Sequence, residues 1–274
     1  MTAPMNVSYD DVLRVWREAD AVEAIDHAWV FDHLMPIGGD LDGPVLEGWT
    51  LLAALAAQTT RLELGVLVTS NRFRPPAMLA KIATTVDVIA GGRLQFGIGV
   101  GSRPDHPLGR REYDAHGLPF VATADAVAAL DEACTVIRKL WTEPAPFDYK
   151  GLTGAFGNPK PVRVPPVLIG GRSAATLRVA ARHADIWNIP GGDHDDVVSR
   201  SALLDRYCAE IGRDPAQIVR SVHFGVDYER PQATRDAIAR SLDAGFRHFV
   251  LSPPAPYPAE VAHWLADRII PGER

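Results

Sequence analysis

The sequence predicts an α/β fold, a (β/α)8 TIM-type barrel whose first strand is short or missing. Seven short apolar segments alternate with helical patterns, and this alternation is typical of a parallel sheet covered by helices. Strand interiors such as 66–68 and 249–251 are continuous apolar runs, as expected for strands buried on both faces. The length of 274 residues suits one barrel, so we expect residues 1–274 to form a single domain.

The first half of the chain contains three predicted strands. Ser8 is a possible N-cap for the first helix, in which apolar residues recur at helical spacing. Pro75 and Pro76 open a later helix, where a missing N–H costs nothing, and Gly91 ends it. A long loop is predicted over 100–120. The predicted strands cover 27–31, 61–68 and 93–99, and the predicted helices cover 8–24, 49–58, 75–91 and 123–141.

The second half contains four further strands, each followed by a helix. Residues 144–166 are rich in Pro and Gly and are predicted to be irregular, with a possible hairpin. A closed barrel requires eight strands, so the remaining strand would have to lie within 3–7, before the first helix. The strands are predicted over 167–169, 185–189, 218–226 and 246–252, and the helices over 173–183, 197–211, 232–244 and 258–269.

Composition and charge argue against several classes of protein. The net charge is −6 with both signs interspersed, so we expect no nucleic-acid partner. Because no signal-peptide pattern and no apolar run of about 18 residues are present, we expect a cytoplasmic protein without membrane contact. Cys134 and Cys208 fall in helical patterns and are expected to be small buried residues. No spacing typical of a metal site occurs.

Candidate functional residues follow two strands at their carboxyl ends, where parallel α/β folds build active sites. Asp32 and His33 can orient a ring, accept a hydrogen bond or move a proton; alternatively they cap the barrel mouth as an ordinary loop pair. Arg72 and Arg74 either clamp anionic groups or are solvated loop cations. The candidates for contact with a heterocycle at the end of the second strand are Val68, Thr69, Ser70 and Asn71.

The segment 97–101 reads GIGVG and precedes Ser102. A dinucleotide-binding fingerprint would open directly into a helix, but Pro104 interrupts any helix here, so we reject that interpretation. We expect Gly99 and Gly101 to let a planar ring approach the barrel mouth, with Ser102 beside them.

The turn GGRS follows the strand 167–169 and opens a helix. Backbone N–H groups and the helix dipole make such a turn a natural anion site, although a plain strand-to-helix turn is the alternative. Asn188 ends the next strand and could contact cofactor or substrate. The candidate anion-binding residues are Gly170, Gly171, Arg172 and Ser173.

Five segments, in order, resemble one protein family: WVFDH, LEGWTLLAALAAQTTRLELG, RFRPPAMLAK, GGRLQFGIGVG and VLIGGRSAATLRVAARHADIWN. The chain is thereby similar to the bacterial luciferase-like oxidoreductases, in particular to their deazaflavin-dependent branch. The resemblance implies that coenzyme F-420 binds with Asp32 and His33 at the reactive edge of its ring and the GGRS turn at its phosphate. It also implies a non-proline cis peptide near Leu67-Val68 or Val68-Thr69.

Two positions depart from the sugar-phosphate dehydrogenases of this branch. Those enzymes carry an acidic proton donor after the glycine motif, where this chain has Ser102 and Arg103. They carry a Trp where this chain has Ile37. Sugar-phosphate oxidation is therefore not expected.

The resulting hypothesis is an oxidoreductase that transfers a hydride between coenzyme F-420 and a small organic molecule. An FMN-dependent monooxygenase of the same superfamily is the alternative, because the two ring systems are shaped alike. A non-catalytic barrel that binds a ligand is the third hypothesis, since a trimmed first strand would fit a loss of catalysis. A homodimer is a possible assembly.

Overall fold

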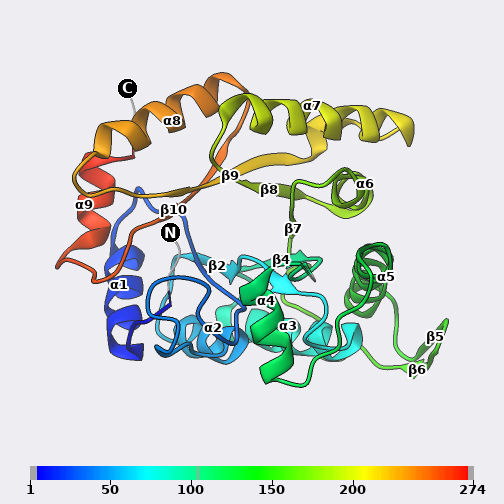
Figure 1. The fold of residues 1–274 in the computed structure, drawn as a ribbon. Helices are drawn as coiled ribbons and strands as arrows, with labels where there is room; N and C mark the ends of the chain where they lie inside the picture. The colour runs from blue at the N-terminus through cyan, green and yellow to red at the C-terminus, as the bar shows by residue number, and fades with distance from the viewer. Residues whose placement is uncertain (1–4, 104, 271–274) are drawn as a thin grey trace.

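The computed structural model describes residues 5–103 and 105–270 and shows a curled parallel sheet surrounded by helices (Figure 1). The strand order is β1-β2-β4-β7-β8-β9-β10, and every neighbouring pair is parallel. A short strand, β3 (Thr69–Ser70), lies beyond the end of β2 and pairs with β4. The main strands are β1 (His27–Val30), β2 (Glu63–Val66), β4 (Leu94–Gly99), β7 (Val167–Gly170), β8 (Ile186–Pro190), β9 (Val219–Gly225) and β10 (His248–Ser252).

The predicted barrel with a short or missing first strand is confirmed. Residues 5–7 form no strand, and positions 3 and 4 of the predicted segment lie outside the described residues. β1 and β10 are consequently the two edge strands of the sheet. The rings of His27 and His248 stack between them with their centroids 4.1 Å apart. Side chains thus occupy the interior between these two edge strands.

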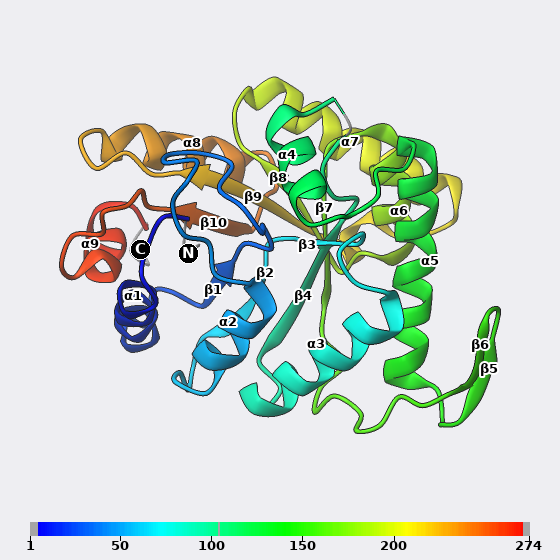
Figure 2. The ribbon, with the colours of Figure 1, turned by 60° about the horizontal axis from the view of Figure 1, so that its bottom comes forward.

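Helices pack against the outer face of the sheet, close to their predicted positions (Figure 2). Their buried faces contribute large side chains such as Trp16 and Leu52 to a core shared with the strands. No helix in the described ranges is both long and apolar enough to cross a membrane. The helices are α1 (Tyr9–Ala21), α2 (Gly48–Ala56), α3 (Pro76–Ala90), α5 (Thr123–Thr142), α6 (Ala174–His183), α7 (His194–Glu210), α8 (Pro231–Asp243) and α9 (Val261–Arg268).

The predicted loop over 100–120 is wrong in its middle, because it contains a helix, α4 (Pro107–Ala115). Pro107 stands in the first turn, where no N–H is needed, and the imidazole of His106 accepts a hydrogen bond from Gly109 N at 3.2 Å. Glu112 and Tyr113 are buried and anchor this polar helix to the rest of the fold. Its stability therefore comes from tertiary contacts rather than from apolar periodicity.

The predicted hairpin is confirmed. β5 (Phe147–Tyr149) and β6 (Leu152–Ala155) form an antiparallel pair at the periphery of the molecule (Figures 1 and 2). It lies away from the carboxyl ends of the main strands.

Candidate active site

A cavity of about 810 Å³ lies at the carboxyl ends of the strands. Its size is typical of sites that bind a cofactor or a small molecule. Among the candidate residues named from the sequence, Asn71 and Arg74 are not in its wall; the N–H of Asn71 donates to Gly99 O at 3.0 Å. The predicted residues that line the cavity are Asp32, His33, Val68, Thr69, Ser70, Gly99, Gly101, Ser102, Gly170, Gly171, Arg172, Ser173 and Asn188.

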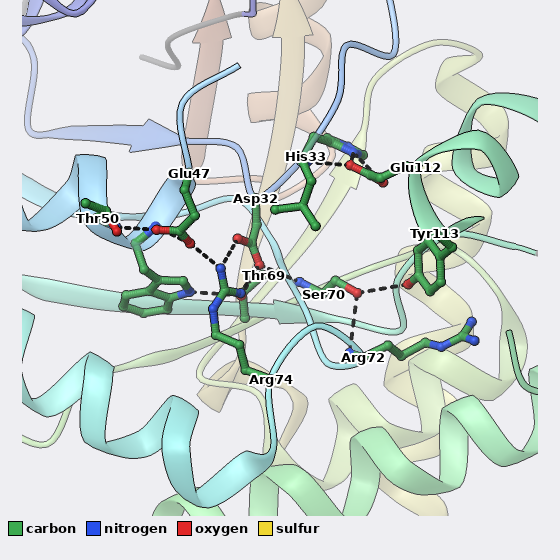
Figure 3. A network of polar contacts seen from close by, with 12 residues as sticks. Asp32, His33, Glu47, Thr50, Thr69, Ser70, Arg72, Arg74, Glu112 and Tyr113 are labelled. Atoms are coloured by element: carbon green, nitrogen blue, oxygen red, sulfur yellow. Dashed lines mark hydrogen bonds and ion pairs between the residues drawn. The ribbon is translucent and has the colours of Figure 1, made fainter. Parts of the chain in front are cut away.

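The carboxylate of Asp32 is buried in a network of internal bonds (Figure 3). Arg74 donates to both of its oxygens, at 2.8 and 2.9 Å, the hydroxyl of Thr69 donates a short bond, and Ser70 N donates at 3.1 Å. Burial raises the pKa of Asp32, and the hydrogen bonds and charge of Arg74 oppose that rise. The carboxylate thus joins the ends of β1 and β3 through protein partners.

The two arginines after the second strand have partners that the sequence did not reveal. Arg74 is neither a solvated cation nor an anion clamp, because it pairs with Asp32 and with Glu47, the N-cap of α2. Arg72 lies 4.7 Å from the ring centroid of Tyr113 and donates to Pro119 O at 2.6 Å. Both side chains therefore fix loops around the cavity.

His33 lines the cavity, and its Nδ1 lies 3.2 Å from both carboxylate oxygens of Glu112 (Figure 3). The Glu112 side chain is 1% exposed, whereas that of His33 is 29% exposed. Leu34 N donates to Glu112 Oε1 at 2.6 Å and Met35 N at 3.4 Å. Sequence reasoning missed Glu112, because it lies on the unpredicted α4 and no motif links it to His33.

Val68 forms a ridge in the cavity wall. The Leu67-Val68 peptide bond is cis, as the family resemblance implied. A Cβ on Gly99 would meet Val68 Cγ2 at 2.7 Å, and one on Gly170 would meet Val68 Cγ1 at 2.9 Å. Gly99 and Gly170 therefore leave room for Val68, and the approach of a planar ring at Gly99 and Gly101 stays a prediction.

The N-terminus of α6 faces the same cavity through Arg172, Ser173 and Thr176. The first N–H groups of a helix lack intrahelical acceptors, and Ser173 Oγ accepts only that of Thr176, at 3.1 Å. The Gly171 N–H is already paired with Asn188 O at 3.1 Å. Arg172 donates to Asp196 at 2.7 Å and is half exposed. The chemistry of this helix terminus, with backbone N–H groups beside Arg172, is of the kind that binds anions, and Arg172 would have to be shared with Asp196.

His223 also lines the cavity, although its sequence context indicated no role. Its Nε2 lies 2.6 Å from the hydroxyl of Ser252, and its ring lies beside Phe31. Burial lowers the pKa of His223 to about 4, so the ring is neutral at neutral pH. The cavity thus contains two imidazoles. That of His33 is paired with the Glu112 carboxylate, and that of His223 is neutral.

A family model described as luciferase-like monooxygenase matches residues 1–273. The chain belongs to the luciferase-like monooxygenase family. It is 31% identical over 226 residues to an uncharacterized protein of Mycobacterium tuberculosis, covering 79% of this chain and 71% of that one. It is 27% identical to the F-420-dependent glucose-6-phosphate dehydrogenase of Kineococcus radiotolerans, covering 77% and 62% of the two chains. The expected family is thus confirmed.

Solved structures in this family share the fold of the chain. An F-420-dependent secondary alcohol dehydrogenase in complex with an F-420-acetone adduct superposes with a TM-score of 0.84 at 19% identity, covering 98% and 96% of the chains. The monooxygenase RslO1 from Streptomyces bottropensis superposes with a TM-score of 0.77, also at 19% identity, covering 98% and 97%. At such identities the likeness establishes the barrel fold, which supports the fold class predicted from the sequence.

Proposed function

We propose that this luciferase-like enzyme transfers a hydride between coenzyme F-420 and a small organic substrate. The observation that carries the proposal is His33, held by a buried carboxylate in the wall of a cofactor-sized cavity. Relatives of the chain include an F-420-dependent dehydrogenase, and the fold matches that of an F-420-dependent alcohol dehydrogenase. These similarities support coenzyme F-420 as the cofactor. The cavity supports the proposed location of the reaction.

We assign different roles to different residues of the cavity. Bound coenzyme F-420 supplies the hydride chemistry. Val68 offers its ring a surface, and the N-terminus of α6 with Arg172 would hold its phosphate. His33 gives a proton to the substrate or takes one from it.

The cationic side chains of the described cavity wall favour an uncharged substrate over a sugar phosphate. Arg72 donates to backbone carbonyls, Arg103 lies 3.6 Å from Asp105, and Arg172 pairs with Asp196. A second anionic group would have to compete with the carbonyl partners of Arg72 and, at Arg172, with both Asp196 and the coenzyme's phosphate. This agrees with the departures at Ile37 and Ser102 in the sequence.

A fluorescence titration of the purified protein tests the coenzyme. We expect coenzyme F-420 to bind with a dissociation constant on the order of 1 μM or below, and FMN to bind more weakly. The family description and the likeness to RslO1 make the FMN-dependent monooxygenase the second candidate. Equal affinities, or a preference for FMN, would favour that candidate. Binding of F-420 without turnover of any alcohol or ketone would favour a non-catalytic binding protein.

The substitution His33→Asn tests the proton-transfer role. Because His33 is partly exposed in a loop, we expect the free energy of unfolding to change by less than about 1.5 kcal/mol. Turnover should fall by roughly 100-fold or more, the usual worth of a positioned proton-transfer group. Melting temperature and rate are measured on one preparation. A variant that melts early but turns over normally would exclude His33 and direct attention to His223.

A further inference from the structure

Glu112 lies on α4, in the segment between β4 and α5, and its side chain lines the cavity. Its carboxylate is buried, and its described partners are His33 Nδ1 and the backbone N–H groups of Leu34 and Met35. All three partners belong to the segment that follows β1. The carboxylate is therefore aimed at the loop that carries the candidate proton-transfer residue.

We infer that Glu112 is a positioning residue that fixes the tautomer and the orientation of the His33 imidazole. An ionised carboxylate only accepts hydrogen bonds, so Nδ1 must carry the hydrogen of the neutral ring. Nε2 is then left with its lone pair, as an acceptor beside the cavity. The inference rests on the proposed function, in which His33 moves the proton: a substrate O–H gives its proton to Nε2, and Glu112 stabilises the imidazolium that forms.

The two oxygens of Glu112 have unequal surroundings. Oε1 accepts from both Leu34 N and Met35 N, whereas His33 Nδ1 is the one described donor within reach of Oε2. In Glu112→Gln the amide oxygen must take the Oε1 position, because two backbone donors point at it. The NH2 group then faces Nδ1 as a donor. This exchange forces the ring hydrogen from Nδ1 to Nε2 while the loop anchor remains.

The next residue of the same helix makes a parallel contact. The hydroxyl of Tyr113 lies 3.1 Å from Ser70 Oγ, and Ser70 lines the cavity (Figure 3). Glu112 thus contacts His33 after β1, and the adjacent Tyr113 contacts Ser70 of β3. The helix acts on the cavity through these two contacts.

Long-range ¹H–¹⁵N NMR of the full chain labelled in histidine tests the inference without any substrate. The His33 signals are assigned by their loss in His33→Asn. We expect wild-type His33 to carry its hydrogen on Nδ1, and Glu112→Gln to carry it on Nε2. Turnover of Glu112→Gln should fall by roughly 100-fold while its affinity for coenzyme F-420 stays within about twofold. A merely structural role would leave the tautomer unchanged.

Asp114→Asn is the matched control, because Asp114 lies on α4, is 56% exposed and pairs with Arg110. It should leave the His33 signals as in the wild type. Hydrogen on Nε2 in the wild type, or an unchanged tautomer in Glu112→Gln, would overturn the inference. If the variant fails to fold, the tautomer seen in the wild-type spectrum is the deciding result. A wild type with the expected tautomer but no affinity for coenzyme F-420 would overturn the proposed function and still support the pairing.

Discussion

The carboxylate of Asp32 lies in the cavity wall, but its hydrogen bonds stabilise the fold. It accepts hydrogen bonds from Arg74, Thr69 and Ser70, and the Arg74 side chain is only 14% exposed. Removing one partner of a buried ion pair leaves the other charge uncompensated. We therefore expect Asp32 to affect turnover through the shape of the cavity, whereas the neighbouring His33 acts on the substrate.

Asp32→Asn should lower the free energy of unfolding by about 3 kcal/mol, because it leaves a buried guanidinium with one carboxylate partner fewer. Urea denaturation followed by circular dichroism measures this loss. Asp42→Asn is the control, since Asp42 is 92% exposed and pairs with Arg111 at the surface. The control should change stability by less than about 0.5 kcal/mol. Equal, small effects of both substitutions would show that the Asp32 pair contributes little.

The sequence predicted site residues correctly where those residues stand at or directly after the carboxyl end of a strand. The positions of His33, Thr69 and Asn188 in the cavity wall follow from parallel topology, because the carboxyl ends of the strands meet at one edge. The partner of His33 could not be predicted in the same way. Glu112 is 79 residues away along the chain, and only the folded path of α4 brings it to the imidazole.

At the scale of elements, α4 shows why a helix can escape detection. Its sequence PLGRREYDA has a Gly in the first turns and mostly polar side chains, so no apolar stripe indicates a helix. The strands and the longer helices were predictable because their apolar runs match their burial. α4 instead depends on two buried side chains, Glu112 and Tyr113, whose partners lie in distant segments.

Substitutions at the N-terminus of α6 distinguish the contribution of the Arg172 side chain to anion binding from that of the backbone amides. Arg172→Ala should weaken the binding of coenzyme F-420 by about 1.5 kcal/mol, the lower end for a charged hydrogen bond, because Asp196 shares the guanidinium. Asp196→Asn should strengthen binding by freeing that guanidinium. Arg200→Ala is the control, since Arg200 also pairs with Asp196 but lies outside the cavity wall. Equal affinities in all three variants would leave backbone amides as the anion site.

At the scale of the whole molecule, a polar column runs through the interior of the sheet between two cavities. Asn188 Nδ2 donates to Ser221 Oγ at 2.7 Å, and Ser221 Oγ lies 2.7 Å from His248 Nδ1. His248 and the stacked His27 line a second cavity, of about 680 Å³, at the amino ends of the strands. The interior is therefore a packed core of rings and hydrogen-bonded groups that separates the two cavities.

Buried histidines of this interior, among them His223 and His248, make the stability of the whole fold depend on pH. Burial lowers the pKa of His223 and of His248 to about 4, whereas an unfolded histidine titrates near 6.5. Between these values the unfolded chain binds protons that the folded chain does not, so stability falls as the pH falls. We expect a loss of about 2 kcal/mol per ring between pH 7 and pH 5.

Urea denaturation of the wild type and of His223→Asn/His248→Asn, at pH 7 and at pH 5, measures this dependence. The double variant should be less stable at pH 7, because it loses the packing of two rings and their bonds to Ser252 and Ser221. Its loss of stability on acidification should nevertheless be smaller by about 4 kcal/mol, since neither replacement titrates. His263→Asn, at an exposed position of α9, should retain the wild-type slope. If the double variant retains that slope as well, the acid sensitivity arises elsewhere and the two rings are not held neutral by burial.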